Sequence, residues 1–118
     1  MSSHKYIEIE QQEEGVLVHF TCRRIIDRSI VEDLAQELYA LIEKRGILKI
    51  VLSFHGVEFL STAALNRLII LERKVRKANG VLVLSSMCQQ IHTVFTITKL
   101  DEVFNIRFDD EETLACIS

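Results

Sequence analysis

The sequence contains no proline, only four glycines and three cysteines in 118 residues. Its longest apolar runs, such as Leu68 to Leu71, are four residues long, whereas a membrane-spanning helix needs about 20. Three widely spaced cysteines do not make a disulfide framework, which favours a reducing compartment. The amino-terminal residues also lack the apolar stretch of a signal peptide. These absences predict a cytoplasmic protein without membrane insertion.

The composition is that of an ordinary globular domain. Hydrophobic residues make up 48% of the chain, the formal net charge is −3, and the mean hydropathy is +0.19. That hydropathy is too high for a disordered chain, and the length suits one domain. A slightly acidic chain without a basic tail also argues against direct nucleic-acid binding. We therefore expect residues 1–118 to form a single domain that binds no nucleic acid.

The chain carries no evident catalytic or metal-binding motif. His19 and Cys22 are three residues apart in an expected strand, so their side chains point to opposite faces. Cys88 and His92 suit one helix face, but no second ligand pair accompanies them. P-loop, glycine-rich and nucleophile-elbow patterns are all absent. We expect core packing for these residues, no metal site, no cofactor and no enzymatic activity.

Hydrophobic periodicity predicts alternating strands and helices. The expected strands cover residues 6–11, 16–20, 47–53, 81–84 and 104–108. Helices are expected to begin at Ser29 with a capping box to Glu32, to span 62–79, and to begin at Ser86 or Cys88 and in the acidic run 109–112. This order predicts an α/β fold with a mixed four- to five-stranded sheet and about four helices.

The helix expected at residues 62–79 has two stripes at helical spacing. An apolar stripe, expected to pack on the sheet, consists of Ala64, Leu68, Leu71, Val75 and Ala78. A second stripe consists of Thr62, Leu65, Ile69, Arg73 and Arg76. Two interpretations of the second stripe remain open. Either its aliphatic residues contact a neighbouring helix and its arginines only face solvent, or it is a partner-docking face that begins at Thr62.

Ser61 and Thr62 lie where a loop meets this helix. Hydroxyl residues commonly cap helices by accepting a hydrogen bond from a free backbone N–H. A hydroxyl in this position is also a suitable phosphorylation site, because the helix N-terminus stabilises an added phosphate. Both interpretations stand on the local pattern alone.

Three successive segments carry a resemblance to a known family. They are IVLSFHGVEFLSTAAL from Ile50 to Leu65, ANGVLVL from Ala78 to Leu84 and FTITKLDEVF from Phe95 to Phe104. Together they resemble the STAS domain family, in particular the anti-sigma factor antagonists and their stressosome relatives. The family pattern F-[IVLM]-D-S-[SA]-G-L corresponds here to Phe59 through Leu65. The family's phosphorylated hydroxyl falls on Thr62, with Ser61 in place of the acid as a rival acceptor or N-cap.

The resemblance implies a binding switch without catalysis. One expected partner is an anti-sigma factor that is also a serine/threonine kinase, and phosphorylation of the switch blocks its binding. The other expected partner is a phosphatase, which restores that binding. The implied partner surface comprises Asp27, Ser61, Thr62, Leu65, Asn66, Ile69 and Arg73. For Asp27 a second interpretation stays open, in which it helps the helix at Ser29 to begin. Two alternatives share the same fold: a scaffold or stressosome-like STAS subunit that is not phosphorylated, and a STAS subunit of a membrane transport ATPase complex.

Overall fold

The computed structural model describes residues 6–12 and 15–107. Its main sheet has five strands in the order β1-β2-β4-β6-β7. These are β1 (Ile7–Gln11), β2 (Val16–Phe20), β4 (Lys49–Ser53), β6 (Val81–Ser85) and β7 (Asn105–Arg107). β1 is antiparallel to β2, and the other neighbouring strands are parallel. The α/β fold with a mixed sheet is therefore confirmed.

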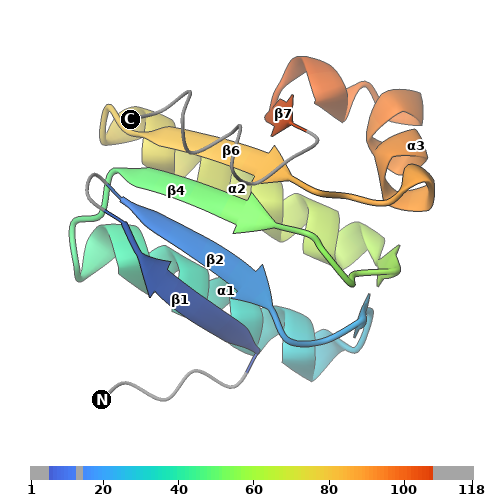
Figure 1. Cartoon of the computed structure of the whole chain (residues 1–118), viewed down its shortest axis with the longest axis horizontal. Coiled ribbons are helices and arrows are strands. Elements are labelled where there is room, and N and C mark those ends of the chain that lie inside the picture. Colours follow the sequence, from blue (N-terminus) through green and yellow to red (C-terminus); the bar gives the residue numbers. More distant parts are fainter. Residues whose placement is uncertain (1–5, 13–14, 108–118) are drawn as a thin grey trace.

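Three helices and a 3-10 turn accompany the sheet. They are α1 (Arg28–Glu43), α2 (Thr62–Lys77), α3 (Gln89–Ile97) and η1 (Leu100–Glu102). Figure 1 shows α1 and α2 side by side behind the sheet, with α3 beyond the end of β6. The described residues thus hold one α-helix fewer than expected, and the fourth expected helix, in the run 109–112, lies outside them.

The three central strands are buried on both faces. In β4, Ile50 and Leu52 point into the main core that α1 and α2 cover, and neither is exposed to solvent. Val51 points the other way and packs with Leu17 of β2 and Val83 of β6, its register partners on either side. Strands with two buried faces appear as continuous apolar runs. This explains why the sequence pattern located β2, β4 and β6 correctly.

The N-cap of helix α1 lies two residues earlier than expected. Asp27, not Ser29, is the N-cap. The Asp27 carboxylate accepts hydrogen bonds from the Ser29 backbone N–H at 2.9 Å and from the Ser29 hydroxyl at 2.7 Å. Glu32 forms an ion pair with Arg67 of α2 instead of closing a capping box. The capping-box prediction is wrong because Asp27 already takes the Ser29 backbone N–H that the Glu32 side chain would have accepted from.

Two residues that follow α2, Asn79 and Gly80, allow the chain to turn toward β6. Asn79 takes up the left-handed backbone conformation, with φ at 62°, which asparagine tolerates better than most residues. Gly80 then passes so close to the chain that an added Cβ would lie 2.3 Å from the carbonyl oxygen of Leu48. The pair thus turns the chain directly from α2 into β6, as the sequence predicts.

A second, two-stranded sheet was not expected. β3 (Arg24–Ile25) pairs in parallel with β5 (Phe59–Leu60), with Arg24 opposite Phe59 and Ile25 opposite Leu60. In Figure 1 this small sheet lies beyond the carboxyl ends of β2 and β4, where α1 and α2 begin. It therefore fixes the starts of the two helices beside each other.

Side chains also join α1 to α2 along their length. Arg67 pairs with Glu32, and the Lys74 ammonium lies 3.2 Å from the Glu43 carboxylate and 5.1 Å from the centre of the Tyr39 ring. Two of the five basic residues of the second helix thus hold the helix pair together. No helix in the described part of the chain is both long and apolar enough to cross a membrane.

Candidate functional site

The candidate site is the loop that connects β4 to α2, from Phe54 to Ser61. It lies at the carboxyl ends of the parallel strands, the edge at which open α/β sheets usually bind their ligands. Its anchor at the start is Phe54, which is fully buried and packs in a tilted arrangement against Phe20, with ring centres 4.9 Å apart. The loop therefore leaves the core from a fixed point.

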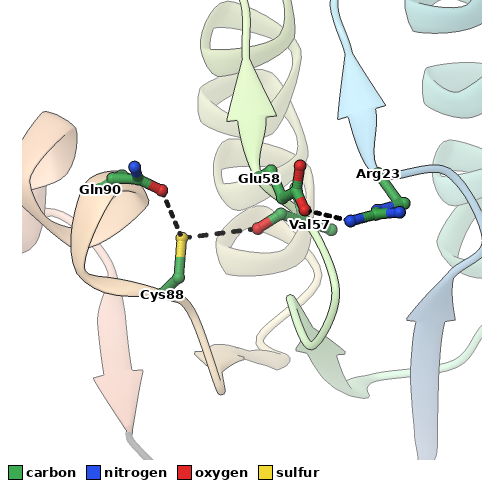
Figure 2. Close-up of polar contacts among 5 residues, drawn as sticks. All are labelled: Arg23, Val57, Glu58, Cys88 and Gln90. Carbon is green, nitrogen blue, oxygen red and sulfur yellow. Dashed lines mark hydrogen bonds and ion pairs between the residues drawn. The ribbon is translucent and has the colours of Figure 1, made fainter.

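Backbone and side-chain bonds attach the loop to β3. The carbonyl oxygen of Arg23 accepts from the Glu58 backbone N–H at 2.7 Å, and the carbonyl oxygen of Ile25 accepts from the Ser61 N–H at 3.0 Å. The Arg23 guanidinium also forms an ion pair with the Glu58 carboxylate, on the right in Figure 2. Because this pair is exposed, its side chains add little stability, and the backbone bonds position the loop.

The opposite side of the loop rests on the start of α3. Cys88, the N-cap residue of α3, donates its thiol hydrogen to the carbonyl oxygen of Val57, with 3.6 Å between sulfur and oxygen. Val57 itself is buried. Figure 2 shows Cys88 and Arg23 on opposite sides of the loop, one against Val57 and the other against Glu58. The loop is thus held from both sides before it enters α2.

Ser61 and Thr62 are placed differently although they are neighbours. The Ser61 hydroxyl accepts a hydrogen bond from the Ala64 backbone N–H at 3.1 Å, so Ser61 is the N-cap of α2 and is half-buried. Thr62 is the first residue of the helix and is exposed. Among the described residues, nothing forms a hydrogen bond with its side-chain hydroxyl. The structure therefore gives the capping role to Ser61 and leaves the Thr62 hydroxyl open to solvent.

Asp27 stands at the start of the neighbouring helix. The β3–β5 pairing places it close to the start of α2, because Ile25 pairs with Leu60 just before both helices begin. Hydrogen bonds from Ser29 hold the pKa of Asp27 below its usual value. The bond from the Ser29 side chain has the larger effect and the bond from its backbone N–H the smaller one. Asp27 is exposed and serves as the α1 cap, which agrees with the interpretation that it helps this helix to begin.

The second stripe of α2 does not form one exposed face. Leu65 is only 7% exposed and belongs to the main core, so its expected place on the docking surface is wrong. A helical projection shows only direction, and here α2 lies deep enough for Leu65 to reach the core. Ile69 is half-buried against the same core, whereas Asn66 and Arg73 are exposed.

The basic residues of α2 are mostly paired. Arg76 forms an ion pair with Glu72 one turn earlier, at 2.9 Å, in addition to the two pairs with α1 described above. Arg73 and Lys77 are exposed and have no carboxylate partner within the described residues. Within the second stripe, Arg76 is therefore paired inside α2 itself. Arg73 is the arginine of this stripe that has no carboxylate partner among the described residues.

The sequence pattern missed an exposed apolar pair beside Thr62. Phe59 is 45% exposed and Ile26 is 43% exposed. The guanidinium of Arg24 lies over the Phe59 ring, 4.8 Å from its centre. Large apolar residues in a short segment suggest core packing, so only the adjacent arginines at positions 23, 24 and 28 were a signal that this segment is at the surface.

The described residues contain no cluster of three or more His, Cys, Asp or Glu side chains that is able to hold a metal ion. His55 is exposed at the beginning of the loop, and its backbone N–H donates to the Ser53 hydroxyl at 3.4 Å. The polar groups of the site are thus hydroxyls, arginines and carboxylates at the surface. This chemistry suits protein binding and modification.

Comparison with protein families settles the class of the chain. The STAS domain model matches residues 6–113. The chain belongs to the STAS family. Comparison with curated protein sequences gives no match.

Solved structures of several other proteins share the fold. An anti-sigma-factor antagonist domain from Planctomyces limnophilus is 21% identical, with a TM-score of 0.83 over 95% of this chain and 97% of that one. An anti-sigma factor antagonist from Mycobacterium paratuberculosis is 20% identical, with a TM-score of 0.81 over 93% and 91%. Phosphorylated SpoIIAA of Bacillus, a cell fate determinant, is 16% identical, with a TM-score of 0.74 over 95% and 99%. At these identities the likeness shows the fold alone.

Proposed function

We propose that this STAS protein is a regulatory switch of the anti-sigma factor antagonist type. In its unmodified form it binds an anti-sigma factor that is also a serine/threonine kinase, and phosphorylation of Thr62 ends that binding. Among the structures that share the fold, SpoIIAA has been solved both phosphorylated and unphosphorylated. This supports a fold that keeps its shape in both states.

The observation that carries the proposal is the division of roles between Ser61 and Thr62. A hydroxyl used as a cap is oriented by its hydrogen bond, and its modification would uncap the helix. Ser61 is in that position, with the Ala64 N–H as its donor. Thr62 is exposed at the first position of α2, so a kinase reaches its hydroxyl without unfolding the helix. Thr62 is therefore the acceptor, and Ser61 is the rival that the capping role argues against.

The chemistry belongs to the partners. In the kinase site the Thr62 hydroxyl oxygen attacks the γ-phosphorus of ATP, its proton passes to a base of the kinase, and ADP leaves. A phosphatase later transfers the phosphoryl group to water. This chain supplies only the acceptor and the binding surface, in keeping with the absence of a catalytic motif in its sequence.

The physical effect of the phosphate is local. It adds a charge of about −1.5 to −2 at the first position of α2. The free N–H groups at the helix start stabilise that charge, so the fold is retained. The surface that continues along α2 through Asn66, Ile69 and Arg73 then faces a hydrated anion, which a partner that fits the bare hydroxyl does not tolerate.

Peptide mass spectrometry tests the proposal on protein purified from its native cells in several growth states. A phosphate on Thr62, absent from the Thr62→Ala variant and retained by Ser61→Ala, is the expected result. A phosphate on Ser61 alone would keep the switch and reject the assignment of the acceptor. Finding no phosphate in any growth state would reject the switch and favour the unphosphorylated scaffold.

A further inference from the structure

The outer face of the small β3–β5 sheet is an apolar surface bordered by arginines. In a strand, alternate residues point to opposite sides. Ile25 is buried and Leu60 half-buried, whereas Arg24, Ile26 and Phe59 are exposed on the outer side. We call these three residues the platform. Ile26 and Phe59 are two of the five large apolar side chains that are clearly exposed in the described part of the chain.

The platform is rigid where it carries these side chains. The Arg23 carbonyl oxygen accepts from the backbone N–H groups of both Glu58 and Phe59, at 2.7 and 3.3 Å. The Arg24 guanidinium covers one face of the Phe59 ring. Phenylalanine and arginine are both enriched at protein interfaces relative to the rest of the surface. Because this pair is preorganised, it loses little conformational entropy when a partner docks.

The electrostatic surroundings of the platform are positive. Neither α1 nor α2, whose starts flank it, has an acidic residue in its first turn, although acids are favoured there. Arg28 occupies the first position of α1 instead, where the helix dipole disfavours a cation. Within the described residues, neither Arg24 nor Arg28 has a carboxylate partner.

Two nearby carboxylates offset part of this charge, but the three arginines at positions 23, 24 and 28 still outnumber them. Glu58 is paired with Arg23, and Asp27 accepts hydrogen bonds from Ser29 as the α1 cap. An exposed cation placed against the local helix dipole is a departure from the usual pattern, and such departures concentrate at functional sites. A partner that complements this surface carries negative charge around an apolar anchor.

We propose that the platform is the docking site for an acidic segment of the partner protein. An aliphatic or aromatic side chain of that segment packs against Phe59 and Ile26, and flanking Asp or Glu residues pair with Arg24 and Arg28. The inference rests on the proposed function for its setting, since the platform leads through Ser61 directly into Thr62. It also accounts for the switch, because a phosphate on Thr62 places negative charge beside the surface that receives an acidic partner.

The test is a display selection with the whole chain as bait and random dodecapeptides as the probe. Selected peptides are synthesised, and their affinities are measured at two salt concentrations. We expect enrichment of an apolar anchor flanked by Asp or Glu, with binding that weakens as salt rises. Phe59→Ala and Arg24→Glu each weaken binding by about tenfold or more. The matched control is Ile97→Ala on α3, a 74% exposed residue, which leaves binding unchanged.

Amide NMR spectra of every variant report whether it is folded. If Phe59→Ala fails to fold, Ile26→Ala and Arg24→Glu carry the test. Selected peptides without acidic residues, or equal binding by the platform variants and wild type, would overturn the proposal. So would the absence of any enrichment, or a dimer of the free chain that Phe59→Ala dissociates, because the occupant is then a second copy.

The outcome is separable from that of the proposed function. Thr62→Ala cannot be phosphorylated but leaves the platform intact, so it retains peptide binding if the platform is the docking site. Peptide binding in a protein that is never phosphorylated in cells supports the platform and rejects the switch. Phosphorylation of Thr62 in a protein without platform binding does the reverse.

Discussion

The Tyr39 hydroxyl of α1 donates a hydrogen bond to the backbone carbonyl oxygen of Arg67 in α2, 3.2 Å away. Burial and the nearby Glu43 raise the pKa of Tyr39 above its usual value, so the hydroxyl keeps its proton over the working pH range. The bond crosses the helix pair near its middle and fixes the position of α2 along α1.

Removal of this hydroxyl gives the first prediction. Tyr39→Phe keeps the ring but removes the donor, and we expect a loss of about 1 kcal/mol in the free energy of unfolding. Urea unfolding followed by circular dichroism measures it. Phosphorylation at Thr62 is expected to be unaffected, and a stability equal to that of wild type would show that water replaces the bond.

Ser61→Ala and Thr62→Ala separate capping from modification. Ser61→Ala leaves the Ala64 N–H without its acceptor and is expected to cost about 1 kcal/mol. Thr62 is exposed and without a hydrogen-bond partner among the described residues, so its truncation stays within about 0.5 kcal/mol of wild type. Thermal unfolding of both variants checks the difference. Equal costs would contradict the assigned roles.

Leu65→Ala and Asn66→Ala test the corrected face of α2. Leu65 is buried in the main core, and its truncation is expected to cost about 2–5 kcal/mol. Asn66, the next residue, is exposed, so Asn66→Ala should change stability by less than about 0.5 kcal/mol. Chemical denaturation of the two proteins provides the comparison. A small loss of unfolding free energy for Leu65→Ala would show that Leu65 is exposed and not buried in the core.

Gly80→Ala and Asn79→Gly probe the end of α2. An alanine Cβ at position 80 would lie 2.3 Å from the Leu48 carbonyl oxygen, and the forced shift is expected to cost about 1–3 kcal/mol. Asn79→Gly is expected to be neutral or slightly stabilising, because glycine adopts a positive φ without strain. Differential scanning calorimetry distinguishes the two. A stable Gly80→Ala protein would mean that the backbone moves apart freely.

Asp27→Asn tests the charge at the start of α1 through pH. The folded-state pKa of Asp27 lies below its ordinary value of 3.8, so the ionised carboxylate stabilises the folded protein. By linkage this advantage over Asn is complete well above pH 3.8 and is lost as pH falls through the lower folded-state pKa. Unfolding free energies of both proteins from neutral to acidic pH reveal it. Parallel curves would show that the charge contributes nothing.

The sequence was sufficient for features set by local chemistry. Continuous apolar runs identify β4 and β6, because a buried parallel strand needs apolar residues on both faces. Asn79 and Gly80 marked the end of α2 because few residues tolerate that turn. The hydroxyl pair at the start of α2 was recognisable because hydroxyl residues commonly cap helices. Only the structure distinguishes the capping residue from the exposed one.

Features set by distant parts of the chain were not predictable. β3 and β5 are two residues each, and their pairing joins segments far apart in the sequence, so no local period reports it. The depth at which α2 lies on the sheet decides the burial of Leu65, and a helical projection contains no depth. The exposure of Phe59 depends on the same small sheet, so in the sequence only the neighbouring arginines hinted that the platform lies at the surface.

The bracing of the loop between Arg23 and Cys88 has a consequence for timing. A loop that is already fixed needs no slow reorganisation before a partner docks, so association is governed by encounter and charge. If Thr62 is modified as proposed, the phosphate changes the surface of a loop that is already held in place. Under the proposed function, the rate of switching is therefore set by the enzymes that add and remove the phosphate, and not by a rearrangement of the domain.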